Sequence, residues 1–113
     1  AGTEGWRLDP EIARALAGRK AADEAHMVVK GTFGPKDLPQ RVQPLLGVGE
    51  PLDVTVVGLC TDICVISTAL LIKAFYPEAH ITVDASCCAG ASREGHRTAL
   101  AAMGPCQIDV VGE

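Results

Sequence analysis

The chain has 113 residues, of which 48% are hydrophobic and 21% are charged, and this balance is typical of one globular domain. The net charge of −4 argues against nucleic acid as a partner, because phosphate binding requires clustered lysine and arginine. No apolar run approaches the roughly 20 residues that span a bilayer. No charged-then-apolar leader opens the chain, so we expect a cytoplasmic protein without a membrane partner.

The five cysteines do not form a complete disulfide framework, because their number is odd. Cys87 and Cys88 are adjacent, and Cys60 and Cys64 lie four positions apart without a histidine nearby. These spacings differ from those of structural zinc sites. We therefore expect free thiols, as in a reducing compartment, and no metal site within this chain.

The first half of the chain predicts short elements separated by turns. In chain order they are a loop (1–8), a helix (10–17), a strand (26–30), a turn (31–35) and a helix (37–46). Asp9 can cap the first helix and Gly18 can end it. Pro39 and Pro44 shorten the second helix to a turn or two at each side.

The second half predicts strands that alternate with helices. The elements are a strand (52–57), a helix from Thr61 or Asp62 to Phe75, a strand (80–83), a loop (84–92), a helix (93–103) and a strand (107–111). Strands separated by helices form parallel units with right-handed crossovers. We therefore predict a single α/β domain over residues 1–113, a Rossmann-like parallel sheet with helices on both faces.

The stretch Val56–Val65 (VVGLCTDICV) is the part around which the rest is organised. A β-branched strand leads into Gly58, which allows a tight turn, and a helix follows. Cys64 then lies in the first helical turn at the carboxyl edge of a strand. Unpaired backbone N–H groups converge there and the helix dipole favours a thiolate, which makes Cys64 a candidate nucleophile. A buried apolar cysteine is the alternative.

The order of residues in Gly58–Val65 resembles the nucleophile motif of the isochorismatase-like cysteine hydrolases, which include nicotinamidases. Lys30–Gly34 (KGTFG) resembles the lysine segment of the same family. The resemblance extends from Thr3 to about Val111 and covers the C-terminal part of the family's fold. It implies a cysteine hydrolase that attacks a small, nicotinamide-like amide through Cys64, forms an acyl-thioester and releases ammonia.

The resemblance also implies roles for other residues. Lys30 ends one predicted strand and Cys64 follows another, so both face the same sheet edge, where a lysine favours the thiolate form of a neighbouring thiol. In the family, the backbone N–H groups of Cys60 and Cys64 form the oxyanion hole, and the Leu59-Cys60 peptide bond is cis. Phe33 and Trp6 either line the substrate pocket or pack.

The resemblance places some functional groups on segments that no part of this chain matches. These are the first strand with its catalytic aspartate and the ligands of a divalent metal such as zinc. We therefore expect an N-terminally incomplete domain that is inactive alone and has no cofactor within this chain. Its partners would be a small amide substrate and either a second copy, in a homo-oligomer, or a complementing N-terminal segment.

Other polar residues receive structural interpretations. For Asp62 we favour a helix cap over a hydrogen bond within the active-site loop. His96 is interpreted as a surface or packing residue, and His26 and His80 have no companions at ligand spacing. Cys87 and Cys88 are expected to face opposite sides of their segment. The segment from Asp84 to Gly90 resembles the loop after the family's fifth strand.

A second class of function remains open. The chain could be a non-catalytic α/β module that keeps the motif as scaffold and serves as a subunit of an assembly. Thiol titration separates the two hypotheses, because a lysine-activated cysteine at a helix start should react with iodoacetamide below about pH 8, ahead of the other thiols.

Overall fold

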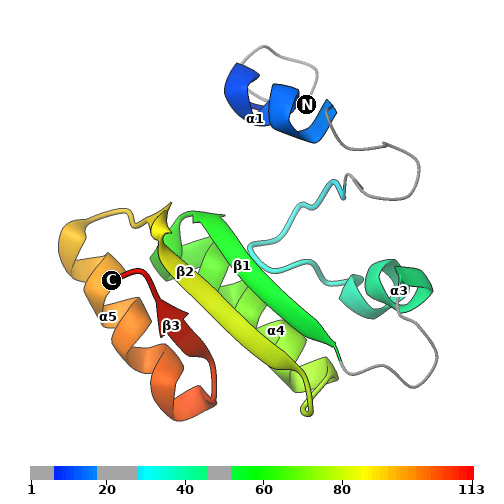
Figure 1. The fold of residues 1–113 in the computed structure, drawn as a ribbon. Coiled ribbons are helices and arrows are strands. Elements are labelled where there is room, and N and C mark those ends of the chain that lie inside the picture. The colour runs from blue at the N-terminus through cyan, green and yellow to red at the C-terminus, as the bar shows by residue number, and fades with distance from the viewer. Residues whose placement is uncertain (1–6, 18–27, 46–51) are drawn as a thin grey trace.

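The fold is seen in a computed structural model that describes residues 7–17, 28–45 and 52–113. Its elements, in chain order, are α1 (Pro10–Ala17), α3 (Leu38–Val42), β1 (Asp53–Leu59), α4 (Ile66–Phe75), β2 (His80–Ala89), α5 (Arg93–Met103) and β3 (Asp109–Val111) (Figure 1). A π-helical turn, Thr61–Val65, precedes α4, and 3₁₀ turns follow α3 (Gln43–Leu45) and α5 (Gly104–Cys106). None of these helices is long and apolar enough to cross a membrane.

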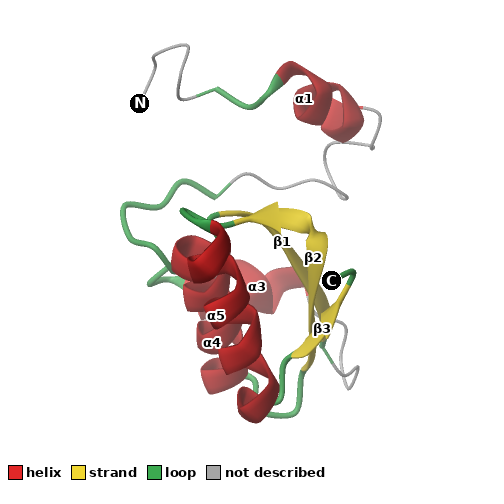
Figure 2. Ribbon diagram, turned by 90° about the vertical axis from the view of Figure 1, so that its left-hand side faces the viewer, coloured by secondary structure: helices red, strands yellow, loops and turns green. Residues whose placement is uncertain are grey.

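The three strands form a parallel sheet in the order β1-β2-β3. Helix α4 leads from β1 to β2, and α5 leads from β2 to β3. Successive right-handed crossovers that step in one direction place their helices on the same face of a sheet. Figure 2 shows α4 and α5 together on one side of the strands. The predicted α/β class with a parallel sheet is confirmed. Helices on both faces stay a prediction, because α4 and α5, the helices that connect the described strands, lie on the same face.

The core lies between the sheet and these helices. Alternate residues of β2 point to one face, so Ile81, Val83 and Ala85 are buried together. The helices and their flanking turns supply the other central side chains, which are Val65, Ala69, Ile72, Ala99, Leu100, Met103 and Ile108. This packing fixes α4 and α5 against the same strands, and it therefore also fixes the turns at the carboxyl ends of β1 and β2.

Strand β1 is an edge of the described sheet, and its outer face is open. Along β1 half-buried residues alternate with exposed ones, and Val57 and Leu59 are 52% and 70% exposed. Large apolar side chains at the edge of a sheet are a site for pairing with another chain or segment. This edge lies next to the predicted nucleophile.

The predicted strand over residues 26–30 is wrong where it can be compared. Val28, Val29 and Lys30 are exposed and belong to no strand, while residues 26 and 27 lie outside the described part. A strand forms only where its backbone groups find a neighbouring ladder. Among the described strands none pairs with this segment, so Val28 and Val29 belong to no strand despite their β-branched side chains.

The predicted loop over residues 84–92 is also partly wrong, because β2 continues to Ala89. Its register with β1 shifts between Val56 and Gly58, after which Gly58 pairs with Cys88 and Leu59 pairs with Ala89. Gly58 has a φ of 124°, which L side chains rarely adopt. The small and polar residues of this segment resemble a loop in the sequence, but the shifted register keeps them in β2.

Helices α1 and α5 agree closely with the predictions, whereas the helix predicted over 37–46 is shorter, since α3 ends at Val42 and a 3₁₀ turn follows to Leu45. Helix α1 spans the predicted residues, and the Asp9 carboxylate accepts a hydrogen bond from the Glu11 N–H at 2.9 Å. Helix α5 begins after Ser92, whose hydroxyl accepts from the Gly95 N–H at 2.9 Å. The last strand is shorter than predicted, because Gln107 adopts a left-handed φ of 64° and the Ile108 N–H bonds back to Met103.

Candidate active site

The turn after β1 has an unusual backbone. The Leu59-Cys60 peptide bond is cis, as the resemblance implies, and this prediction is confirmed. Cys60 is extended, and its carbonyl accepts hydrogen bonds from the N–H groups of Ile63 and Val65 at 3.0 and 3.1 Å. The bond from Val65 spans five residues, which is the spacing of a π-helix. The turn is therefore wider than the start of an ordinary α-helix.

Cys64 lies within this π-helical turn and not in the first turn of α4, which begins at Ile66. π-helical insertions are common at functional sites because they change where backbone and side chains point. Cys60 and Cys64 are both half-buried free thiols. Their backbone N–H groups come from one π-helical turn at the carboxyl edge of the parallel sheet, where ligands bind in open α/β folds.

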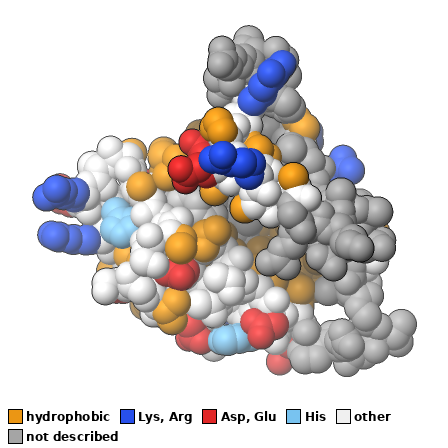
Figure 3. Space-filling model, turned by 45° about the horizontal axis from the view of Figure 1, so that its top comes forward, with side chains coloured by type: hydrophobic (Ala, Val, Ile, Leu, Met, Phe, Trp, Pro, Cys, Tyr) orange, Lys and Arg blue, Asp and Glu red, His pale blue; other side chains and the backbone are white. Residues whose placement is uncertain are grey.

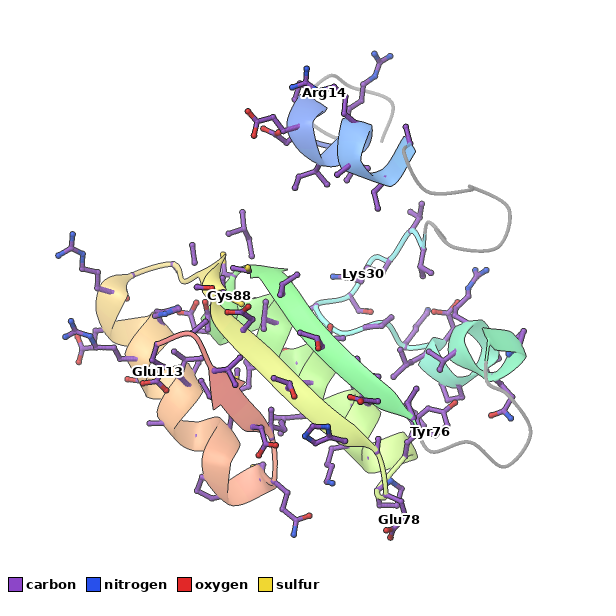
Figure 4. The ribbon with its side chains drawn as sticks, viewed as in Figure 1. Arg14, Lys30, Tyr76, Glu78, Cys88 and Glu113 are labelled. Atoms are coloured by element: carbon purple, nitrogen blue, oxygen red, sulfur yellow. The ribbon has the colours of Figure 1, made fainter. Side chains whose placement is uncertain are left out.

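Lys30 lies on a segment beside the end of β1 (Figure 4). Its ammonium donates hydrogen bonds to the carbonyls of Thr32 at 3.0 Å and Phe33 at 2.8 Å. A lysine ammonium has three donors, so these bonds fix its position and leave one N–H for another acceptor. Lys30 and Cys64 are both described, and no hydrogen bond joins them.

The lysine segment packs closely against α4 at Gly34. A side chain at Gly34 would clash with Leu71, and its Cβ would lie 3.3 Å from the Ser67 carbonyl. Ser67 is three residues beyond Cys64, so this contact joins the lysine segment to the helix that carries the candidate nucleophile. Phe33, in the same segment, is 66% exposed, and its contact with substrate stays a prediction. Trp6 lies outside the described residues.

The preferred interpretation of Asp62 as a helix cap is wrong. No side chain caps the π-helical turn, and the Asp62 carboxylate instead accepts a hydrogen bond from the Ala91 N–H at 3.0 Å. Asp62 also packs against Gly95, where an added Cβ would clash with its carboxylate. Asp62 therefore connects the π-helical turn Thr61–Val65, called the nucleophile turn from here on, to the loop between β2 and α5.

Sequence reasoning also missed a pair of residues beside this link. Thr61 is fully buried, and its hydroxyl lies 2.7 Å from Nδ1 of the half-buried His96. The interpretation of His96 as a surface or packing residue omitted this hydrogen bond, which spans 35 positions in the chain. Two features of the sequence could have indicated the pair: Thr61 lies inside the motif, and His96 lies one turn after Ser92, the cap of α5.

The remaining polar clusters lie apart from the turn. His80 bridges Asp109 and Asp53 at 2.8 and 3.3 Å, at the starts of the three strands and thus at the opposite end of the sheet. The hydrogen bond to Asp109 and the charge of Asp53 raise the pKa of His80 above its ordinary value. Figure 4 shows this separation, with Lys30 and Cys88 at one end of the sheet and Tyr76 and Glu78 at the other.

In the segment that resembles the family's loop, hydrogen bonds from the Ser86 hydroxyl and N–H and from the Cys87 thiol lower the pKa of Asp84, and the hydroxyl has the largest effect. Cys87 is exposed while Cys88 packs against the core, as predicted. Within the described part of the chain, no group of three or more histidine, cysteine or acidic residues could hold a metal ion.

Two cavities lie near the nucleophile turn but are not lined by Cys64 or Lys30. One, of about 480 Å³, lies along α5 beside the start of α4, and its lining includes Asp62, Ile66 and Gly95. The other, of about 320 Å³, lies where β2 leads into α5, and its lining includes Cys88 and His96. Cys64 follows β1, whose last residue, Leu59, is exposed. Figure 3 shows hydrophobic side chains among polar ones on the face that includes this end of the sheet.

These features define an α/β protein with a cysteine in a π-helical turn after a non-proline cis peptide bond, at the carboxyl edge of a parallel sheet. The isochorismatase domain model matches residues 1–112. The chain therefore belongs to the isochorismatase family. None of the curated proteins compared with the chain matches it.

Solved structures of related enzymes share the fold. The chain is similar to the nicotinamidase of Staphylococcus aureus, with 26% identity and a TM-score of 0.80 over 100% of this chain and 69% of that one. It is also similar to the nicotinamidase of Bacillus subtilis, with 25% identity and a TM-score of 0.78 over 97% of this chain and 60% of that one.

A third solved structure has lower sequence identity, and its similarity to this chain concerns the fold only. It is a pyrazinamidase of Pyrococcus horikoshii in complex with zinc, with 22% identity and a TM-score of 0.60 over 80% of this chain and 49% of that one. The chain thus spans roughly half to two thirds of the length of these three relatives.

Proposed function

We propose that this chain is the nucleophile-bearing part of a cysteine amidohydrolase that acts on a small amide such as nicotinamide. The observation that carries the proposal is the position of Cys64 in the π-helical turn that follows the cis Leu59-Cys60 bond. Membership of the isochorismatase family supports hydrolysis, and the similar nicotinamidases support an amide substrate.

In the proposed reaction, the thiolate of Cys64 attacks the amide carbonyl carbon, and the carbonyl oxygen becomes an oxyanion. The backbone N–H groups of Cys60 and Cys64 donate hydrogen bonds to that oxyanion. The C–N bond then breaks, the nitrogen takes a proton and leaves as ammonia, and an acyl-thioester remains on Cys64. Water attacks the thioester carbonyl, which releases the acid and restores the thiol.

Lys30 is proposed to stabilise the thiolate and to orient the substrate. The carbonyls of Thr32 and Phe33 hold its ammonium in place, and the contact of Gly34 with α4 couples this segment to the helix after Cys64. The resemblance assigns proton transfer to an aspartate on a strand that no segment of this chain matches. We assign this role to a carboxylate outside residues 1–113. The ligands of a divalent metal in the complete protein are likewise proposed to lie outside residues 1–113.

A non-catalytic assembly subunit is the second candidate, and the exposed Val57 and Leu59 on the edge strand favour it. Substitution of the two cysteines separates the candidates. In the full-length protein, Cys64→Ala should abolish ammonia release from nicotinamide and leave the folded state intact. Cys60→Ala should cause a smaller loss, because only its backbone N–H takes part. Equal losses in the two variants would refute the assignment, and a wild-type protein without turnover would support the assembly role.

A further inference from the structure

The nucleophile turn is fastened to a distant part of the chain. Thr61 begins the turn, has no exposed surface, and lies with its hydroxyl 2.7 Å from Nδ1 of His96 on α5. The next residue, Asp62, accepts a hydrogen bond from the Ala91 N–H in the loop before α5. Consecutive residues of the turn thus contact the following crossover.

The backbone of His96 is held in place by the first turn of α5. Its N–H donates to the Ser92 carbonyl at 3.0 Å, within the first turn of a helix whose cap is the Ser92 hydroxyl. Gly90 packs so closely against this turn that an added Cβ would lie 2.9 Å from both N and Cβ of His96. These contacts hold the backbone and the Cβ of His96 in place, and from there the imidazole reaches Thr61.

The buried hydroxyl of Thr61 depends on this ring. A buried hydroxyl without a partner is costly, and among the described residues no buried side-chain nitrogen or oxygen lacks a partner. The contact survives either tautomer of His96, because a hydroxyl can donate to Nδ1 or accept from it. Loss of the ring nitrogen would release Thr61 while leaving the apolar core in place.

Movement of Thr61 would displace the groups that take part in the proposed reaction. Thr61 directly follows Cys60 and lies three residues before Cys64, so a rotation of the turn moves the sulfur and both proposed oxyanion donors together. Such donors act only within about 2.7–3.1 Å of the developing charge. We infer that His96, through its hydrogen bond to Thr61, is a positioning residue that holds the Cys60–Cys64 turn in its reactive geometry. This inference rests on the proposed function.

Two amide substitutions at the same position test the inference. The amide of asparagine lies close to the place of Nδ1 in histidine, whereas the amide of glutamine reaches farther, near the place of Nε2. In the full-length protein, His96→Gln should lower kcat for amide hydrolysis about 10- to 100-fold with KM nearly unchanged, the size expected for a misplaced reacting group. His96→Asn should recover most of the lost kcat.

Thr61 provides the partner test. Thr61→Val keeps the shape and removes the hydroxyl, so it should match His96→Gln, and the double variant should be no worse than either single one. Thr61→Ser keeps the hydroxyl and should retain activity. Additive losses in the double variant, or equal losses in His96→Asn and His96→Gln, would overturn the inference.

A second measurement does not depend on amide turnover. Backbone hydrogen exchange over residues 60–65 should accelerate in His96→Gln and return toward the wild-type rate in His96→Asn, with exchange in β2 unchanged. Unchanged exchange over residues 60–65 in His96→Gln, or faster exchange throughout the chain, would contradict a positioning role. If the wild-type protein releases no ammonia, the proposed function fails, and the exchange data still decide whether His96 holds the turn.

Discussion

Gly34 offers a direct test of how the lysine segment is coupled to the nucleophile. A Cβ at this position would clash with the Leu71 side chain and would lie 3.3 Å from the Ser67 carbonyl. Leu71 can rotate away at a cost of about 0.5–1.5 kcal/mol for a poor rotamer, but the Ser67 carbonyl belongs to the backbone of α4 and cannot. The segment that carries Lys30 must therefore move outward.

We expect Gly34→Ala to lower the free energy of unfolding by about 1–3 kcal/mol, the usual range for overpacking. The same displacement should lower kcat by about 10- to 100-fold, because small shifts of a catalytic group cost that much. Urea unfolding and ammonia release from nicotinamide measure the two effects in one protein preparation.

Gly31→Ala is the matched control, because a Cβ at Gly31 would meet nothing within 4 Å. It lies in the same segment and should change stability by less than about 0.5 kcal/mol. If both alanine variants lose activity equally, the flexibility of the segment matters and its contact with α4 does not. If Gly34→Ala keeps full activity, Lys30 does not depend on α4 for its position and the coupling is wrong.

Further predictions concern the strand ends and the open edge. The raised pKa of His80 means that its links to Asp109 and Asp53 stabilise the fold fully below the unfolded-state pKa of about 6.5, and this contribution is lost as pH rises through the higher folded-state value. In the wild type, loss of this contribution should lower the urea midpoint as pH rises, and His80→Gln should remove that fall. If the variant and the wild type show the same dependence of urea midpoint on pH, His80 does not have this role. The 113-residue chain expressed alone should aggregate or self-associate and be inactive on nicotinamide, because Val57 and Leu59 are exposed on β1, which pairs with β2 but has no neighbour on its outer side among the described strands. Addition of an N-terminal segment of the family's fold should restore a compact species and turnover in size-exclusion and ammonia-release assays. A compact, active monomer of the bare chain would instead mean that an acidic residue within it, such as Asp62 or Asp84, serves as the catalytic carboxylate.

The strands and helices after residue 52 could be predicted from the sequence because their signals are local. The β-branched run before Gly58, the cap at Ser92 and the end of α4 before Pro77 each lie within a few residues of the element they define. The cis bond before Cys60 was predictable only through the resemblance of the motif. Periodicity and composition carry no information about a cis peptide bond.

The errors arose where distant residues decide the outcome. Residues 28–30 resemble a strand, but a strand requires a neighbouring ladder that the local sequence does not specify. Asp62 resembles a helix cap, yet its carboxylate bonds to Ala91, 29 positions away. The contact between Thr61 and His96 likewise depends on how α5 packs against the turn after β1. These links determine the geometry of the candidate site and were therefore the part that sequence patterns could not supply.

The most direct test of the central claim is to trap the covalent intermediate. The full-length protein should be mixed with nicotinamide, quenched in acid within one turnover, digested and analysed by mass spectrometry. We expect a nicotinoyl group on the peptide that contains Cys64, bound to that sulfur, and no such group in Cys64→Ala. Ammonia release without an acyl adduct, or an adduct on Cys60, Cys87, Cys88 or Cys106, would contradict the assignment of Cys64 as the nucleophile.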